Sequence, residues 1–108
     1  MIDLKIKALS VNKAWQGKRY KTKDYKTYEL YLLHLLPKKI FIPKGKKHLK
    51  IIFGINKLAD IDNGIKPLLD VLQKKYNFND RDIYKLEVEK IDVKKDNEFI
   101  KFEMYECN

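Results

Sequence analysis

Asp60, Asp62 and Asp80 are the side chains of this sequence that are best suited to hold a divalent cation. Residues two apart on an extended segment project from the same face, so the first two carboxylates can point together and repel each other unless a cation lies between them. Mg²⁺ suits this arrangement because it takes oxygen ligands, usually one or two carboxylates with waters and phosphate oxygens. The spacing therefore predicts a metal site formed by these three acids.

Simpler interpretations of the same acids compete with the metal site. Asp60 and Asp62 precede a predicted helix, so they could merely cap it and oppose its dipole. Asp80 follows Asn79, and Asn-Asp pairs favour turns through local hydrogen bonds. Asp82 competes with Asp80 for the third ligand position. Two acids on one face, with a third where the chain returns after the helix, favour the metal site over these alternatives.

Lys66 is the basic residue placed nearest to the acids in sequence. It lies four residues after Asp62, which on a helix or its first turn puts the ammonium beside the carboxylates. The alternative is a surface ion pair with Asp62 or Asp70, which is worth under about 1 kcal/mol. Asp70, one helical turn further along, could orient the lysine.

Charge is distributed unevenly along the chain, whose net charge is +9. Residues 1–59 contain fifteen Lys or Arg against three acids, whereas residues 60–108 contain nine basic residues against twelve acids. Cations that hold a polyanion beside carboxylates that hold a metal are what a phosphodiester-cutting enzyme needs. The alternative is a solvated Lys-rich surface, since Lys outnumbers Arg by 22 to 2.

The segment from Asn12 to Lys23 interleaves Trp15 and Tyr20 with five basic residues. This combination suits phosphate contacts together with stacking on unpaired bases. The alternative is a solvated Lys-rich loop that contacts no ligand. The predicted phosphate-binding residues are Lys13, Lys18, Arg19, Lys21 and Lys23.

Hydrophobic periodicity predicts strands and helices in alternation. Residues 2–8, from Ile2 to Ala8, alternate as a strand, and residues 10–24 form an exposed basic loop. Residues 25–36 form a helix, with Asp24 as a possible N-cap and Pro37 as its end. Residues 40–42 are a short strand candidate, and residues 48–55 a central strand. A second helix opens near Gly64 and ends before residues 76–80. Residues 83–93 and 99–105 form a hairpin with Asp96-Asn97 in its loop.

These elements predict a single α+β domain over residues 1–108, with two layers: a mixed sheet of four or five strands and two helices on one face. The sequence has no apolar run of about 18 residues, as a membrane helix requires, and no signal-peptide pattern. We therefore expect no membrane partner and a cytoplasmic location. Neither histidine has a second His or a Cys at ligand spacing, so zinc is not expected.

The acidic block resembles the RusA family of Holliday junction resolvases. Residues 60–72, DIDNGIKPLLDVL, and residues 79–83, NDRDI, which lead into LEVEK, are similar to the family's D-x-D-N-x-x-K-x-x-x-D-A-L helix start, D-D-x-Q-V turn and following strand. Residues 9–12, LSVN, are similar to its P-S-x-N segment, with Leu9 in place of proline. Some members have a basic residue before the first acid, where this chain has Ala59.

The resemblance implies a Mg²⁺-dependent endodeoxyribonuclease, for which Mn²⁺ can substitute, that resolves four-way DNA junctions in recombination and repair. Asp60, Asp62 and Asp80 match the metal-associated acids, Lys66 matches a catalytic lysine, and Asn12 matches a DNA-binding position. A homodimer is also implied, because two symmetric cuts need two sites. The alternatives are a noncatalytic nucleic-acid-binding module and a metal nuclease for other branched or single-stranded substrates.

Overall fold

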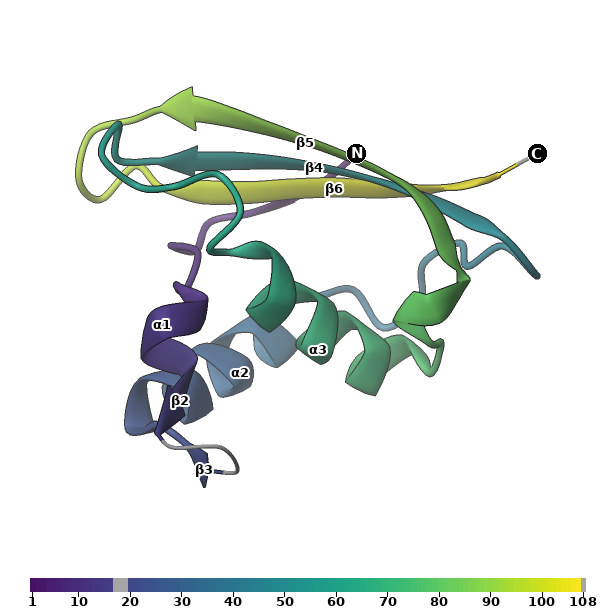
Figure 1. The fold of residues 1–108 in the computed structure, drawn as a ribbon, viewed down its shortest axis with the longest axis horizontal. Helices are drawn as coiled ribbons and strands as arrows, with labels where there is room; N and C mark the ends of the chain where they lie inside the picture. Colours follow the sequence, from purple (N-terminus) through teal and green to yellow (C-terminus); the bar gives the residue numbers. More distant parts are fainter. Residues whose placement is uncertain (17–19, 108) are drawn as a thin grey trace.

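A central nine-residue strand organises the sheet of this protein, whose computed structural model describes residues 1–16 and 20–107. This strand, β4 (Lys47–Ile55), pairs in parallel with β5 (Ile83–Asp92) and antiparallel with β6 (Phe99–Glu106). β1 (Ile2–Leu4) pairs antiparallel with β6, which gives the order β1-β6-β4-β5 (Figure 1). The predicted mixed sheet of an α+β domain is confirmed.

Two long helices cover one face of this sheet (Figure 1). α2 (Lys23–Leu35) begins after the N-cap Thr22, whose hydroxyl accepts a hydrogen bond from the backbone of Tyr25 at 3.1 Å. α3 (Ile65–Tyr76) begins after Gly64, as predicted. The predicted N-cap at Asp24 is wrong: this residue lies in the first turn of α2, because Thr22 is extended and already supplies the cap.

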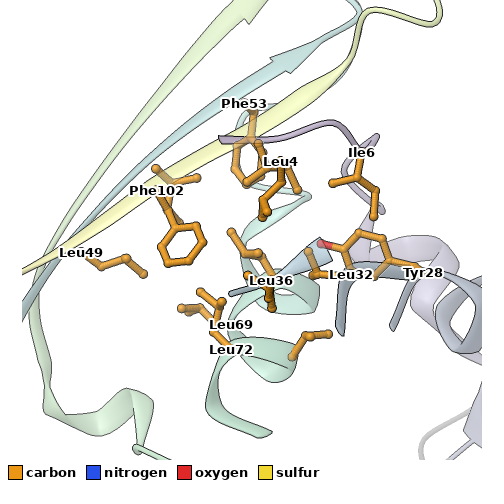
Figure 2. Close-up of a cluster of buried hydrophobic side chains, with 14 of the residues drawn as sticks. Leu4, Ile6, Tyr28, Leu32, Leu36, Leu49, Phe53, Leu69, Leu72 and Phe102 are labelled. Atoms are coloured by element: carbon orange, nitrogen blue, oxygen red, sulfur yellow. The ribbon is translucent and has the colours of Figure 1, made fainter. Parts of the chain in front are cut away.

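The core lies between the sheet and these helices, as Figure 2 shows. Alternate residues of β4 and β6 face inward, because successive side chains of a strand point to opposite faces. They meet leucines of α2 and α3. The fully buried members of the core are Leu32, Leu49, Ile51, Phe53, Leu68, Val71, Leu72, Ile100 and Phe102.

The predicted hairpin between the last two strands is wrong. β5 and β6 each pair with β4, which lies between them, and residues 93–98 connect the two outer strands past the end of β4. The apolar alternation identified both strands, but it does not specify the partner of a strand. From Leu49 to Ile55 the buried face of β4 is apolar, and a strand that is paired on both edges has hydrogen-bond partners for its backbone on each side.

The predicted strand at residues 40–42 is also absent. Ile40 and Ile42 pack partly buried against the core, whereas Phe41 is exposed. Alternating burial along a connection that crosses an apolar surface gives the same period of two as a strand, so the pattern does not distinguish the two.

The predicted basic loop of residues 10–24 contains more regular structure than expected. It includes a single turn of helix, α1 (Val11–Ala14), and two short paired strands, β2 (Trp15–Gln16) and β3 (Tyr20–Lys21). A backbone hydrogen bond from Thr22 to Ala14, of 3.0 Å, closes the base of this segment. Residues 17–19, which include Lys18 and Arg19 of the predicted phosphate-binding set, lie outside the described part of the chain.

A final short element, the 3₁₀ helix η1 (Asp80–Asp82), connects α3 to β5. Within the described residues, no helix has both the length and the apolar character that crossing a lipid bilayer requires.

Candidate functional site

Asp60 and Asp62 lie in the turn that carries the chain from β4 to α3. Both side chains are exposed, and neither carboxylate forms a hydrogen bond or ion pair with another described residue. The backbone of this turn is ordered by a 3.3 Å hydrogen bond from Asn63 to Asp60 and a 3.2 Å bond from Ile65 to Asp62. The simpler interpretation, that these acids cap the helix, is wrong, because α3 starts at Gly64 without a side-chain cap bond.

Gly64 allows this acidic turn to pack against the sheet. A Cβ atom at this position would lie 3.1 Å from the Cβ of Ala8 and 3.1 Å from the ring of Phe53. These contacts are tighter than a side chain normally makes, so glycine lets the turn approach both β4 and the segment that follows β1. The acids are thereby held at the surface directly beside residues 6–10.

Lys90 of β5 fixes the segment just before Asp60. Its ammonium donates hydrogen bonds of 2.8 Å to the carbonyl oxygens of both Lys57 and Ala59. Such charge-assisted hydrogen bonds are stronger than neutral ones. Lys90 was missed in the sequence because nothing in its spacing relates it to residues thirty positions earlier; the parallel pairing of β4 and β5 brings it there.

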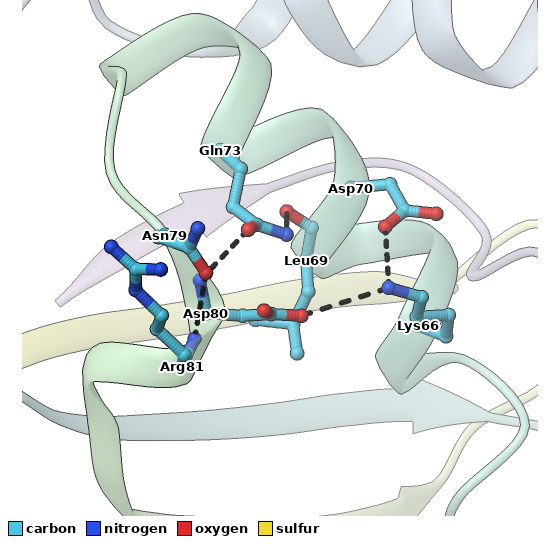
Figure 3. Close-up of polar contacts among 7 residues, drawn as sticks. All are labelled: Lys66, Leu69, Asp70, Gln73, Asn79, Asp80 and Arg81. Atoms are coloured by element: carbon cyan, nitrogen blue, oxygen red, sulfur yellow. Dashed lines mark hydrogen bonds and ion pairs between the residues drawn. The ribbon is translucent and has the colours of Figure 1, made fainter.

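Asp80 follows α3 in the chain, and its carboxylate reaches back to the first turn of this helix. Its carboxylate lies 3.6 Å from the ammonium of Lys66, which also pairs with Asp70 at 3.0 Å (Figure 3). The hydrogen-bonded Asp70 carboxylate and, more weakly, Asp80 raise the pKa of Lys66 above its ordinary value, even though partial burial acts in the other direction. The lysine therefore keeps its positive charge through the neutral and alkaline range.

Gln73 positions the backbone at Asp80. Its side-chain carbonyl accepts a 2.8 Å hydrogen bond from the Asp80 N–H, and its amide donates a 3.1 Å bond to the carbonyl of Leu69 (Figure 3). The next turn is capped by Asn79, whose side chain accepts from the backbone of Arg81. Asp80 therefore faces Lys66 from a fixed turn. Gln73 was also missed in the sequence, because a glutamine within a helix gives no signal of the turn that it will meet.

The three acids predicted to share a metal ion are not assembled in the structure. Within residues 1–16 and 20–107, no three Asp, Glu, His or Cys side chains gather in a way that could hold one. The Asp80 carboxylate turns to Lys66 in the first turn of α3. Asp60 and Asp62 lie in a hydrogen-bonded turn and not on the extended segment that the prediction assumed. They remain neighbours in one turn, and Mg²⁺ commonly takes only one or two carboxylates from a protein.

Basic residues from three other segments line a hollow of about 950 Å³ together with part of the acidic turn. Asp60 lines this hollow together with Lys7, Lys13 and Lys23. None of the three ammonium groups forms an ion pair or hydrogen bond with another described residue. The arrangement places free cations near a free carboxylate, as binding of a phosphate group beside a divalent cation would require.

The predicted phosphate-binding residues thus divide into three groups. Asn12, Lys13 and Lys23 are exposed. Lys21 is instead 3.1 Å from Glu29 and lies over the ring of Tyr25, so it anchors the segment to α2. Lys18 and Arg19 lie outside the described residues.

Glu29 joins this basic segment to α3. It accepts hydrogen bonds from Lys21 at 3.1 Å and from Lys74 at 3.0 Å, and its side chain is only 13% exposed. Burial acts to raise the pKa of Glu29, but the bonds from Lys74 and Lys21 outweigh it and hold the pKa below its ordinary value. The basic segment is therefore fixed relative to both helices.

Comparison with known proteins adds no relative to these observations: neither the scan against protein-family models nor the search of curated proteins finds a match to this chain.

Proposed function

We propose that the protein is a Mg²⁺-dependent endodeoxyribonuclease that cleaves branched DNA, with four-way junctions as its substrate in recombination and repair. The observation that carries the proposal is the pair of exposed, unpaired carboxylates at Asp60 and Asp62, beside a hollow lined by three free lysines. The likeness of the acidic block to the RusA family supports the same reaction. A reaction on DNA would place the protein in the cytoplasm.

In this proposal each group has a distinct role. Asp60 and Asp62 would hold the cation, which when bound would supply an activated water for attack on the phosphodiester. Lys13 and Lys23 would contact the phosphates of the DNA strand. Lys66 pairs with Asp70 and Asp80 in the structure, so its proposed role of stabilising negative charge at the scissile phosphate requires its ammonium to turn away from these carboxylates.

The decisive experiment compares nicking of a synthetic four-way junction with nicking of a linear duplex of equal length, with and without Mg²⁺. Asp60→Asn and Asp62→Asn should each retain junction binding and lose Mg²⁺-dependent nicking by about 100-fold or more. Asp92→Asn, at another exposed acid, is the matched control and should nick normally. Unchanged nicking by Asp60→Asn would end the proposal, and equal cleavage of both DNAs would assign another nuclease substrate.

A noncatalytic nucleic-acid-binding module is the second candidate, because the described residues contain no assembled group of three metal-binding side chains. This candidate predicts junction binding that depends on Lys13 and Lys23 but no nicking under any metal. Both candidates predict that affinity falls steeply with salt, through release of counterions from DNA.

We also propose that the active form is a homodimer, joined through β5. This ten-residue strand is an edge of the sheet, paired with β4 on one side. Leu86, which pairs with the buried Leu49 of β4, is 42% exposed, and Tyr84, at the register shift near the start of β5, is 64% exposed. A long edge with uncovered apolar side chains is suited to pairing with a second strand.

Charge selects one register for two copies of β5 paired antiparallel. When Leu86 lies on the two-fold axis, each Lys85 faces Glu87 of the other copy and Leu86 meets Leu86. If the axis passed through Lys85, the Lys85 side chains of the two copies would face each other. If it passed through Glu87, the two Glu87 side chains would face each other. Opposite charges stabilise such cross-strand pairs and like charges destabilise them, so the axis at Leu86 is favoured.

A further inference from the structure

The hollow beside Asp60 is built from segments that lie far apart in sequence. Its walls come from residues 6–10 after β1, from α1 and α2, and from the turn between β4 and α3. Its volume of about 950 Å³ lies at the upper end of the range of roughly 300–1,000 Å³ typical of ligand pockets. The proposed cation site at Asp60 is therefore part of the wall of a hollow that can take a small organic group.

Large apolar side chains at this hollow are left uncovered. Tyr31 is 52% exposed and Leu58 is 84% exposed, and both line it. Tyr31 comes from α2 and Leu58 from the acidic turn, so their positions are fixed by different elements. An exposed aromatic ring at the wall of a pocket offers a flat surface on which a planar group can stack.

The charges of the hollow suit a phosphate group next to that planar group. Lys7, Lys13 and Lys23 outnumber the two acids of the lining, Asp24 and Asp60. The lysines come from three different segments and are unpaired within the described residues, so one phosphate can approach any of them without breaking an existing ion pair.

A second hollow, which Tyr31 also lines, adds no attraction for a longer stretch of the DNA strand. This hollow of about 700 Å³ is lined by Lys5 and Lys7 on the basic side and by Asp96 and Glu98 on the acidic side. Its charges balance, so it adds no attraction for phosphate. Tyr31 and Lys7 line both hollows, but lysines outnumber acids only in the first.

We propose that this hollow binds one unpaired nucleotide, with its base stacked on Tyr31 and its phosphate held by the lysines. The inference rests on the proposed function, because it names the part of the DNA that lies beside Asp60. Bases within a duplex are paired and stacked on each other and cannot enter, whereas bases at a branch point or in a single strand can. The site therefore selects DNA with an unpaired nucleotide next to the phosphate to be cut.

The test measures binding in EDTA, so that it does not depend on cleavage. The probes are a fluorescent eight-residue oligothymidylate and an abasic oligonucleotide of the same length, and the readout is fluorescence anisotropy. Tyr31→Ala should weaken binding of oligothymidylate about tenfold and leave binding of the abasic strand unchanged, since stacking needs a base. Tyr31→Trp should retain or strengthen oligothymidylate binding.

Phe41→Ala is the matched control, because Phe41 is 62% exposed and lines neither hollow. It should bind both probes like the unsubstituted protein. Equal losses from Tyr31→Ala and Phe41→Ala, or an equal loss for the abasic strand, would overturn the inference, and so would binding that Tyr31→Ala does not change. Circular dichroism checks that Tyr31→Ala is folded, and the Tyr31→Trp result remains decisive if it is not.

Failure of this inference is distinguishable from failure of the proposed function. Mg²⁺-dependent nicking of a junction by a protein that binds both probes equally would keep the nuclease and reject the nucleotide site. Binding that depends on Tyr31, without nicking under any metal, would keep the site and reject the nuclease.

Discussion

Lys90→Met tests whether the position of Asp60 depends on the ammonium that holds the preceding segment. Methionine keeps most of the apolar stem of lysine and removes only the charged donor. The substitution deletes two 2.8 Å hydrogen bonds, to the carbonyl oxygens of Lys57 and Ala59. Any effect therefore comes from release of the acidic turn rather than from a cavity.

The expected magnitude follows from the environments of the two bonds. A hydrogen bond from a charged donor contributes about 1.5–3 kcal/mol when it is shielded from water, and less when it is exposed. The bond to Ala59 is partly buried, whereas the bond to Lys57 is exposed. Together they should stabilise the closed turn by about 1–2 kcal/mol, which is roughly a tenfold change in the fraction of time that the turn is open.

Hydrogen exchange measures this opening directly. The amide of Asn63, which donates to the Asp60 carbonyl, should lose about tenfold in protection in Lys90→Met, while amides in the centre of β4 should change only by the loss of global stability. Lys95→Met is the control, since this lysine follows the same strand, is exposed and forms no ion pair with another described residue. Unchanged protection at Asn63 would refute the argument that Lys90 positions the turn.

Nicking provides the second readout of the same substitution. If Asp60 must be positioned for the proposed reaction, Lys90→Met should lower the rate about tenfold, with Lys90→Arg intermediate, because guanidinium keeps the charge but has another geometry. A full nicking rate together with lost protection would show that the turn is ordered by Lys90 but that its order does not limit the reaction.

Other substitutions test the core, the ion pairs and the proposed dimer. Tyr28→Phe should raise the free energy of unfolding by about 1 kcal/mol and the Tm by about 4 °C, because the buried hydroxyl has no hydrogen-bond partner in the described structure. A lower Tm in calorimetry would contradict this. Glu29→Gln should destabilise by about 1–2 kcal/mol at pH 7, because it weakens two hydrogen bonds from lysine. Folding lowers the pKa of Glu29, so the difference in stability between the two proteins should persist above about pH 4.3, the ordinary pKa of a glutamate. It should vanish as the pH falls below the pKa of Glu29 in the folded protein. A difference in stability that is independent of pH in thermal scans would reject the ion pairs. Lys85→Glu should weaken dimerisation about tenfold in sedimentation equilibrium, and the further substitution Glu87→Lys should restore it, whereas a dimer insensitive to both would place the interface elsewhere.

The helix that follows the acids was predictable because several local signals agree. Gly64 and Pro67 mark its start, and a repeating apolar face continues to Leu72. The buried alternation of β4 was predictable for the same reason. Each of these features depends on residues that are close in sequence, so the pattern carries the information directly.

Strand order and the contacts of the acids depend on residues that are distant in sequence. The insertion of β4 between β5 and β6 follows from pairing that periodicity does not encode. In the same way, Lys66 was placed beside Asp62 by helical spacing, but in the structure its side chain extends along α3 to Asp70 and Asp80. Spacing gives the face of a helix on which a lysine lies, and not the direction in which its flexible stem points.

The acidic segment around Asp60 and Asp62 and the one around Asp80 differ in how their carboxylates are paired. In both segments the backbone is fixed by a side chain from another element or turn: Lys90 holds the residues before Asp60, and Gln73 holds the N–H of Asp80. The Asp80 carboxylate lies 3.6 Å from the ammonium of Lys66, whereas the carboxylates of Asp60 and Asp62 have no partner among the described residues. Two like charges on an ordered turn repel each other and add nothing to folding unless a cation joins them. An ordered turn with two acids left unpaired is therefore the arrangement that the proposed cation site requires.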